Sequence, residues 1–141
     1  HAGESASIRM PHAIRPWQHV LEPLYGYLTL AESIWHDPGK AGAYNFGPEP
    51  HEASTVERVV GMAQDAFGAG DIHWGDAFKG PHEAGWLALE TALARDELGY
   101  HPRWGLEDSV YRTINWYRSW YDGVDARLLC ERDIQAFLES A

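Results

Sequence analysis

Apolar residues recur at helical spacing between positions 20 and 35, and this pattern constrains the fold more than any other feature of the chain. It predicts an amphipathic helix from about His19 to His36. Pro23 falls in the first turn, where its missing N–H is harmless, and Asp37-Pro38-Gly39 ends the helix. The stripe consists of Val20, Leu21, Leu24, Tyr27, Leu28, Ala31, Ile34 and Trp35.

Shorter patterns along the rest of the chain alternate between strands and helices. We expect extended segments at Ser7 to Met10, Ala43 to Phe46, Ile72 to Trp74 and Trp86 to Leu89. We expect helices from the capping box Ser54-Thr55-Val56-Glu57 to Gly68, from Thr91 to Leu98, from Gly105 to Gly123 and from Glu131 to Ser140. The order predicts a single domain over residues 1–141, of the α/β class and α+β as an isolated unit, rich in helices and with a few short strands.

The helical patterns also predict which side chains are buried. The expected buried positions are Val56, Val59, Val60, Ala63, Phe67, Leu106, Val110, Ile114, Tyr117, Tyr121, Ile134, Phe137 and Leu138. The single cysteine, Cys130, is expected to be a small buried residue near a helix rather than a reactive thiol.

The charge balance is strongly acidic, with 21 Asp and Glu against 11 Lys and Arg. This balance disfavours nucleic acid as a partner. No apolar run is long enough to cross a bilayer and no charged-then-apolar leader opens the chain, so we expect a soluble, cytoplasmic protein with no membrane partner.

The motifs of several common chemistries are absent from the sequence. Neither His51-Glu52 nor His82-Glu83 is followed by a second histidine at zinc-binding spacing, so no metal is expected. The nearest approach to a dinucleotide fingerprint, Gly68-Ala69-Gly70, lacks the final glycine and leads from a helix into a strand. No tyrosine is followed by lysine four positions on. The residues alone therefore indicate no catalytic centre.

One run suggests recognition of a ligand. Ile14-Arg15-Pro16-Trp17-Gln18-His19 places an arginine, a tryptophan and a histidine around a proline, which is unusual for a plain helix start and typical of a ligand-facing loop. The guanidinium of Arg15 suits a phosphate or carboxylate, which it can hold with two hydrogen bonds.

This run also carries a family resemblance. Arg15-Pro16-Trp17-Gln18-His19-Val20, Ala43-Tyr44-Asn45-Phe46-Gly47-Pro48, Pro81-His82-Glu83-Ala84 and Leu98-Gly99-Tyr100-His101-Pro102 closely resemble, in collinear order, the C-terminal part of CDP-glucose 4,6-dehydratases. These enzymes belong to the extended short-chain dehydrogenase/reductase superfamily. The resemblance implies late elements of a Rossmann domain followed by a helix-rich substrate lobe. The glycine-rich NAD loop and the Tyr-x-x-x-Lys pair belong to the N-terminal half of the full-length family, so we expect no cofactor in this chain.

The resemblance also implies substrate-binding residues. Arg15 matches an arginine that contacts the substrate diphosphate, Asn45 lies at a strand end beside the substrate, and His82 and Glu83 lie in a loop that closes over the nucleotide. The alternatives are a surface salt bridge for Arg15 and a strand-end cap for Asn45. The segment Leu89-Glu90-Thr91 departs from the Asp-x-Ser-Lys type that opens the following helix in the family.

Two functions follow from these observations. The chain is expected to be a truncated or stand-alone relative of the dehydratases that binds a CDP-sugar and does not catalyse dehydration alone. The alternative is a non-enzymatic module that self-associates, with a lapsed ligand site. In both cases we expect a homo-oligomer, with an interface that includes Leu24, Leu28 and Ile34 of the first helix. A third possibility is that a separate chain supplies the N-terminal half.

Overall fold

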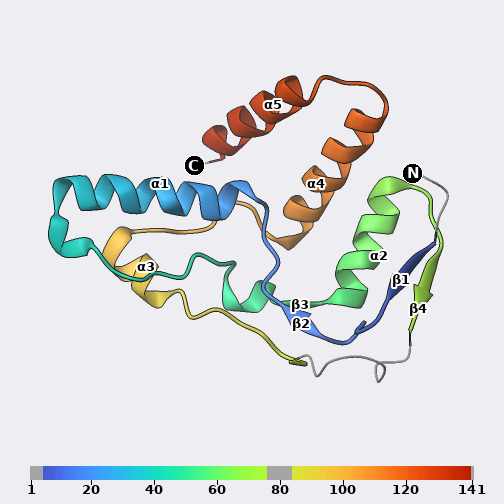
Figure 1. Cartoon of the computed structure of the whole chain (residues 1–141), viewed down its shortest axis with the longest axis horizontal. Helices are drawn as coiled ribbons and strands as arrows, with labels where there is room; N and C mark the ends of the chain where they lie inside the picture. Colours follow the sequence, from blue (N-terminus) through green and yellow to red (C-terminus); the bar gives the residue numbers. More distant parts are fainter. Residues whose placement is uncertain (1–4, 76–83, 141) are drawn as a thin grey trace.

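A computed structural model describes residues 5–75 and 84–140. This part of the chain contains five α-helices and a few short strands in two small sheets, which confirms the helix-rich α/β class (Figure 1). The helices are α1 (Leu21–His36), α2 (Val56–Phe67), α3 (Ala92–Leu98), α4 (Leu106–Tyr121) and α5 (Ala126–Glu139). The strands are β1 (Ala6–Ile8), β2 (Ile14–Arg15), β3 (Ser54–Thr55) and β4 (Ile72–Trp74), and short 3-10 turns lie at Pro38–Lys40 and Pro50–Glu52.

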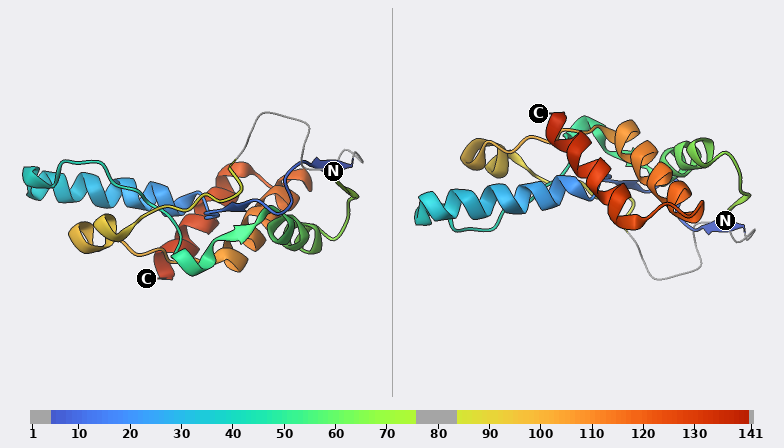
Figure 2. Two further views of the ribbon diagram at one scale, coloured as in Figure 1. Left: turned by 90° about the horizontal axis from the view of Figure 1, so that it is seen from below. Right: turned by 90° about the horizontal axis from the view of Figure 1, so that it is seen from above.

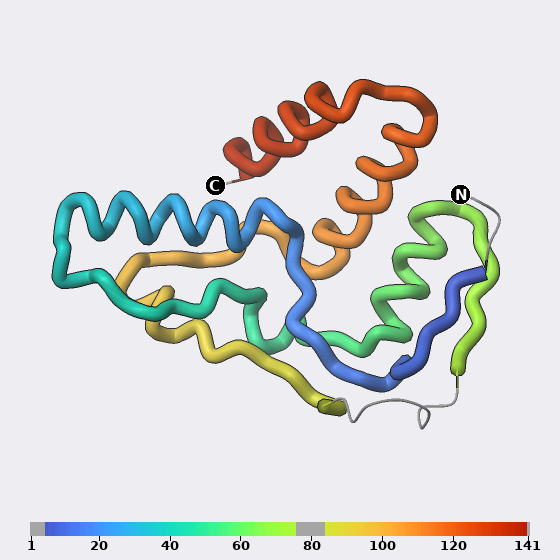
Figure 3. The backbone as a smooth tube through the Cα atoms, viewed as in Figure 1, coloured from blue at the N-terminus to red at the C-terminus, as the bar shows by residue number. Residues whose placement is uncertain are grey.

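The two sheets lie toward one end of the molecule, and α1 extends toward the other. β1 pairs with β4 in parallel, and β2 pairs with β3 in an antiparallel ladder. Figure 2 shows α1 extending away from the rest of the chain, with α3 and the segment after α1 beside its far half. The tube in Figure 3 shows α4 and α5 as a helical hairpin whose last turns return toward α1.

The core is aromatic and forms where α1, the segment before α4, and α5 meet. Trp104 packs edge-on against Phe137 with ring centroids 5.0 Å apart, and Tyr100 packs against Phe46 at the same distance. Phe46 in turn lies directly on α1 at Gly26, where an added Cβ would come within 2.4 Å of the ring. A helix position that is usually costly for glycine is therefore required here for close packing.

The apolar stripe of α1 does not face this core. Glu22 and Gly26 are the buried residues of the helix, whereas Leu28 is 71% and Trp35 is 85% exposed. Val20, Leu24 and Tyr27 are also exposed, and Ile34 is half-buried. Such a stripe normally packs against another element. The bounds predicted for this helix are confirmed to within two residues, but α1 presents its apolar side to solvent.

Several other predictions about local structure need correction. The N-cap of α2 is Thr55, whose side chain accepts a hydrogen bond from the Arg58 N–H, while Ser54 pairs in β3. The last helix begins at Ala126 rather than near Glu131, because Asp125 caps it by accepting from the Leu128 N–H. Ala43 to Phe46 is extended but forms no strand ladder, and at Trp86 to Leu89 only a single bridge forms.

Some predicted buried side chains are exposed, and the exposed set includes the cysteine. Phe137, Val59 and Leu106 are buried as predicted. The side chains expected in the core that are exposed instead are Tyr117, Tyr121, Ile134, Leu138 and Cys130. α4 packs on the core through Leu106 and α5 through Leu129 and Phe137, whereas the neighbouring turns of both helices stay in solvent. None of the helices in the described ranges combines the length and apolar character that a membrane span requires.

Candidate functional site

Arg15 lies in β2, a two-residue strand with a neighbouring segment on each side. On one side, β2 pairs with β3, with Arg15 opposite Ser54. On the other side, Ile14 donates its N–H to the Gly85 carbonyl at 2.9 Å and accepts from the Leu87 N–H at 3.1 Å. The sequence pattern indicated a loop here, whereas the structure places Arg15 in a strand that two other parts of the chain, β3 and the segment from Gly85 to Leu87, hold in place.

The Arg15 side chain is half-buried and held close to its own strand. Its Nη1 donates to the main-chain oxygen of Ile14 at 2.8 Å. Next to this strand, Trp86 bridges to Ile14 and is 67% exposed. An arginine and an exposed indole on neighbouring segments are the two kinds of group that suit a phosphate attached to a ring, since the fork binds oxygens and the indole offers a flat surface.

The residues that follow Arg15 anchor the chain rather than face a ligand. Trp17 donates its indole N–H to the Ser54 carbonyl at 3.0 Å, and Gln18 donates its amide to the Phe46 carbonyl at 3.0 Å. His19 is buried against Trp104, with ring centroids 4.8 Å apart. Three of the residues that made this run distinctive therefore fix the position of β2, and Arg15 remains as its candidate ligand contact.

Asn45 contacts the chain segment that continues from Trp86. Its side chain is exposed, and its amide donates to the Glu90 carbonyl at 3.1 Å. Gly47, two residues on, is so close to Leu89 that an added Cβ would come within 2.9 Å of that side chain. Leu87 is hydrogen-bonded to Ile14, next to Arg15, and Glu90 is hydrogen-bonded to Asn45. The segment from Leu87 to Glu90 can span at most about 11 Å, which limits the distance between these two points of attachment.

The other two predicted contacts, His82 and Glu83, lie outside the described residues. The described chain resumes at Ala84, directly before the Gly85 carbonyl that pairs with Ile14. The roles of Arg15, Asn45, His82 and Glu83 in substrate binding stay predictions. For Asn45, the bond to Glu90 shows that its amide also supports the backbone.

Glu22 is a buried acidic residue that the sequence patterns did not single out. Its side chain is 0% exposed, and Oε1 accepts from the main-chain N–H groups of Trp104 at 2.8 Å and Arg103 at 3.0 Å. Burial raises the pKa of Glu22, while the two N–H donors oppose this shift. Glu22 thus joins α1 to the segment before α4, and no sequence signal beyond its place in the helix identifies this role.

His19 is a second buried titratable group in this region. Its Nδ1 accepts from the Leu21 N–H at 3.3 Å, and its Nε2 lies 4.0 Å from Oδ2 of Asp133. Burial, assisted by the positive charge of Arg112, lowers the pKa of His19 to about 4. The imidazole is therefore neutral at pH 7 and acts as a packed acceptor.

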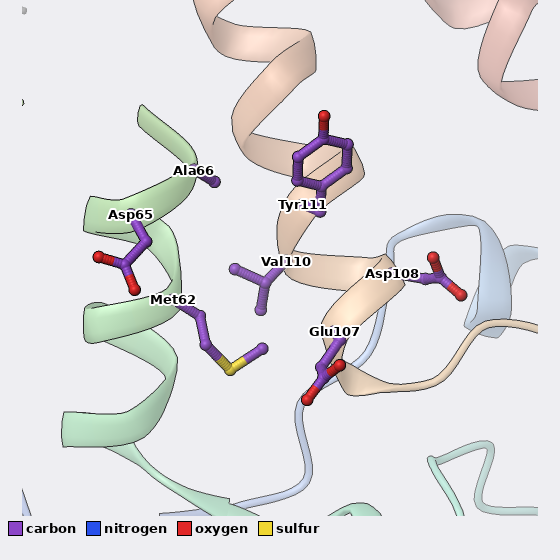
Figure 4. Close-up of a pocket in the computed structure, with 7 residues that line it drawn as sticks. All are labelled: Met62, Asp65, Ala66, Glu107, Asp108, Val110 and Tyr111. Atoms are coloured by element: carbon purple, nitrogen blue, oxygen red, sulfur yellow. The ribbon is translucent and has the colours of Figure 1, made fainter. Parts of the chain in front are cut away.

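A hollow between α2 and α4 does not fit an anionic ligand (Figure 4). It has a volume of about 480 Å³, with Met62 and Val110 pointing toward each other between the helices. Asp65, Glu107 and Asp108 contribute three carboxylates to its lining, and none of its lining residues is basic. Phosphate would be repelled here, and no group of three metal-ligating side chains is found among the residues that the structure describes.

Comparison with known proteins places this geometry in a family context. No protein-family model matches the chain. The chain is 39% identical over 135 residues to the CDP-glucose 4,6-dehydratase of Salmonella typhimurium, covering 94% of this chain and 37% of that protein. It is 33% identical over 118 residues to the dTDP-glucose 4,6-dehydratase of Streptomyces antibioticus, covering 81% of this chain and 33% of that protein.

These relatives confirm the resemblance to sugar-nucleotide dehydratases. The chain spans about a third of the length of the curated relatives it matches, which fits the C-terminal part of such an enzyme.

Proposed function

We propose that this chain binds the diphosphate of a nucleotide sugar at the edge formed by Arg15, Trp86 and Asn45, with a CDP-sugar as the ligand. The observation that supports this most is the position of Arg15. An arginine is fixed in a strand whose neighbouring segment carries an exposed indole, in a chain similar to a CDP-glucose 4,6-dehydratase. Trp86 offers a surface for a ring, and Asn45 offers an amide on the same edge.

The described residues do not fit NAD, the cofactor of the full-length family. A dinucleotide site needs a glycine-rich turn that leads from a strand into the N-terminus of a helix. Here Gly68 ends α2 in a left-handed conformation, with a φ of 80°, and the chain then enters β4. This turn therefore does not lead to the N-terminus of a helix, whose free N–H groups would bind the pyrophosphate. We infer that these residues hold a substrate and that oxidation requires residues other than those described here.

Replacing Arg15 with alanine is expected to weaken the binding of CDP by about tenfold to a hundredfold, the usual effect of losing a charged hydrogen-bond partner. Isothermal titration calorimetry with CDP and CDP-glucose measures this change. Arg58→Ala is the matched control, because Arg58 is an exposed arginine on α2 that pairs with Glu107. Equal affinities for the parent chain and Arg15→Ala, or no heat at millimolar CDP, would rule out the proposal.

The alternative function, self-association without a ligand, is favoured by the exposed face of α1. Val20, Leu24, Tyr27, Leu28 and Trp35 are all exposed and follow the spacing of a helix–helix contact. A second copy of the chain is the occupant that we propose for this face, because the same stripe on both copies is self-complementary about a two-fold axis.

Replacing Leu28 with glutamate is expected to convert a dimer into a monomer, because it places a charge in the centre of the apolar stripe. Size-exclusion chromatography with light scattering at micromolar concentration measures the mass. Leu93→Glu is the control, since Leu93 is exposed on α3. A parent chain that is already monomeric at this concentration would exclude self-association through α1.

A further inference from the structure

The space between α4 and α5 is a polar hollow. Its volume is about 370 Å³, within the range of small-ligand sites. Asp108, Arg112, Asn115 and Trp116 lie on one face of α4 at helical spacing, and Arg132 and Asp133 face them from α5. Two helices that pack only for stability would bring apolar side chains together at this position. A polar lining points to a different use.

The hydrogen-bonding capacity of Arg112 is only partly used in this hollow. Its guanidinium lies 4.1 Å from the centre of the Trp104 ring, and its Nε is buried without a hydrogen-bond partner. Among the residues that the structure describes, neither Arg112 nor Arg132 has a salt-bridge partner. A buried donor without a partner is costly, and native structures contain few of them.

The two acidic groups of the hollow form no salt bridge with either arginine. Oδ2 of Asp133 lies 4.0 Å from Nε2 of His19, so this carboxylate is directed toward the histidine. Burial raises the pKa of Asp133, and the positive charge of Arg112 opposes this shift. Asp108 lines the hollow from α4 and is exposed to solvent. Two guanidinium groups thus line one hollow beside two carboxylates, and within the described residues neither guanidinium forms a salt bridge.

We propose that the hollow between α4 and α5 binds a small oxyanion, a phosphate or carboxylate group, between Arg112 and Arg132. The guanidinium forks match the oxygens of such a group. Asn115 adds an amide donor, and Trp116 provides a flat surface for a ring attached to the anion. The site uses different residues from the edge at Arg15, so neither proposal depends on the other.

Nuclear magnetic resonance with sodium phosphate or sodium acetate, at an ionic strength held constant with chloride, tests the site. We expect saturable shifts of the Trp116 indole N–H and of the arginine Nε–H signals. Arg132→Gln is expected to weaken binding by at least about tenfold. Arg118→Gln is the matched control, because Arg118 is exposed on α4 and does not line the hollow, and it should change affinity by less than about twofold.

The two salts separate the sources of the anion. Saturation by phosphate alone identifies a phosphorylated ligand, and saturation by acetate as well extends the site to carboxylates; either result supports the proposal. Shifts that do not saturate with either salt, or equal affinities for the parent chain and Arg132→Gln, would overturn it. Arg132 is exposed on α5, so its replacement leaves the fold intact and the test remains decisive.

Discussion

Replacing Glu22 with alanine is expected to lower the free energy of unfolding by about 4 kcal/mol. The substitution leaves the N–H groups of Arg103 and Trp104 without their acceptor, and each buried donor left unpaired costs about 1–3 kcal/mol. It also opens a cavity at a position with no solvent access. Since a domain of this size is usually stable by about 5–15 kcal/mol, the variant should be close to unfolding. Urea denaturation followed by circular dichroism measures the loss.

Glu22→Gln separates the role of the acceptor from the role of the charge. Glutamine keeps an oxygen for the two N–H groups and removes the buried charge whose desolvation raises the pKa of Glu22. We therefore expect this variant to lie within about 1.5 kcal/mol of the parent chain. If Glu22→Ala were as stable as Glu22→Gln, the two hydrogen bonds would not hold α1 to the segment before α4.

The stability of the chain is expected to fall by roughly 3 kcal/mol between pH 6.5 and pH 4 because of His19 alone. Burial lowers the pKa of this histidine from 6.5 to about 4 in the folded protein. The unfolded chain therefore binds a proton first as the pH falls, which favours unfolding. The contribution is fully present above pH 6.5, is lost progressively down to about pH 4, and does not change further below that value. Each unit of difference in pKa corresponds to about 1.4 kcal/mol.

His19→Gln isolates this contribution from those of nearby acidic groups. Burial raises the pKa values of Glu22 and Asp133, so their protonation on acidification opposes the loss. The difference in unfolding free energy between the parent chain and His19→Gln cancels these effects and should change by about 3 kcal/mol across the window. His51→Gln is the control, because His51 is exposed. A difference that does not vary with pH would show that the pKa of His19 is the same in the folded and the unfolded chain.

The bounds of α1 could be predicted from the sequence because local residues set them. Pro23 in the first turn and Asp37-Pro38-Gly39 at the end act within one turn of the helix. The buried side of the helix could not be predicted in this way. It depends on Phe46, which packs on Gly26, and on the N–H groups of Arg103 and Trp104, which come about 80 residues later. An apolar stripe alone does not show which partner covers it.

In the candidate site, too, the local chemistry could be predicted from the sequence but the position in the fold could not. The sequence identified Arg15 by its chemistry, but its place in a strand depends on Ser54 and on Leu87, which are distant in sequence. The run that contains Trp17 and Gln18 looked like a ligand-facing loop because it gathers an arginine, a tryptophan and a histidine around a proline. The structure shows Trp17 and Gln18 bound to main-chain carbonyls. Trp86, by contrast, had no motif of its own, and its position beside β2 could be found only in the fold.

The most direct test of nucleotide-sugar binding is a map of the signals that change when CDP is added. In a titration followed by nuclear magnetic resonance, the Nε–H of Arg15 and the indole N–H of Trp86 should shift together and saturate. The same shifts should occur with CDP-glucose and should be absent with glucose alone. Saturable shifts confined to the hollow between α4 and α5, or no saturable shift at Arg15 and Trp86, would contradict the account.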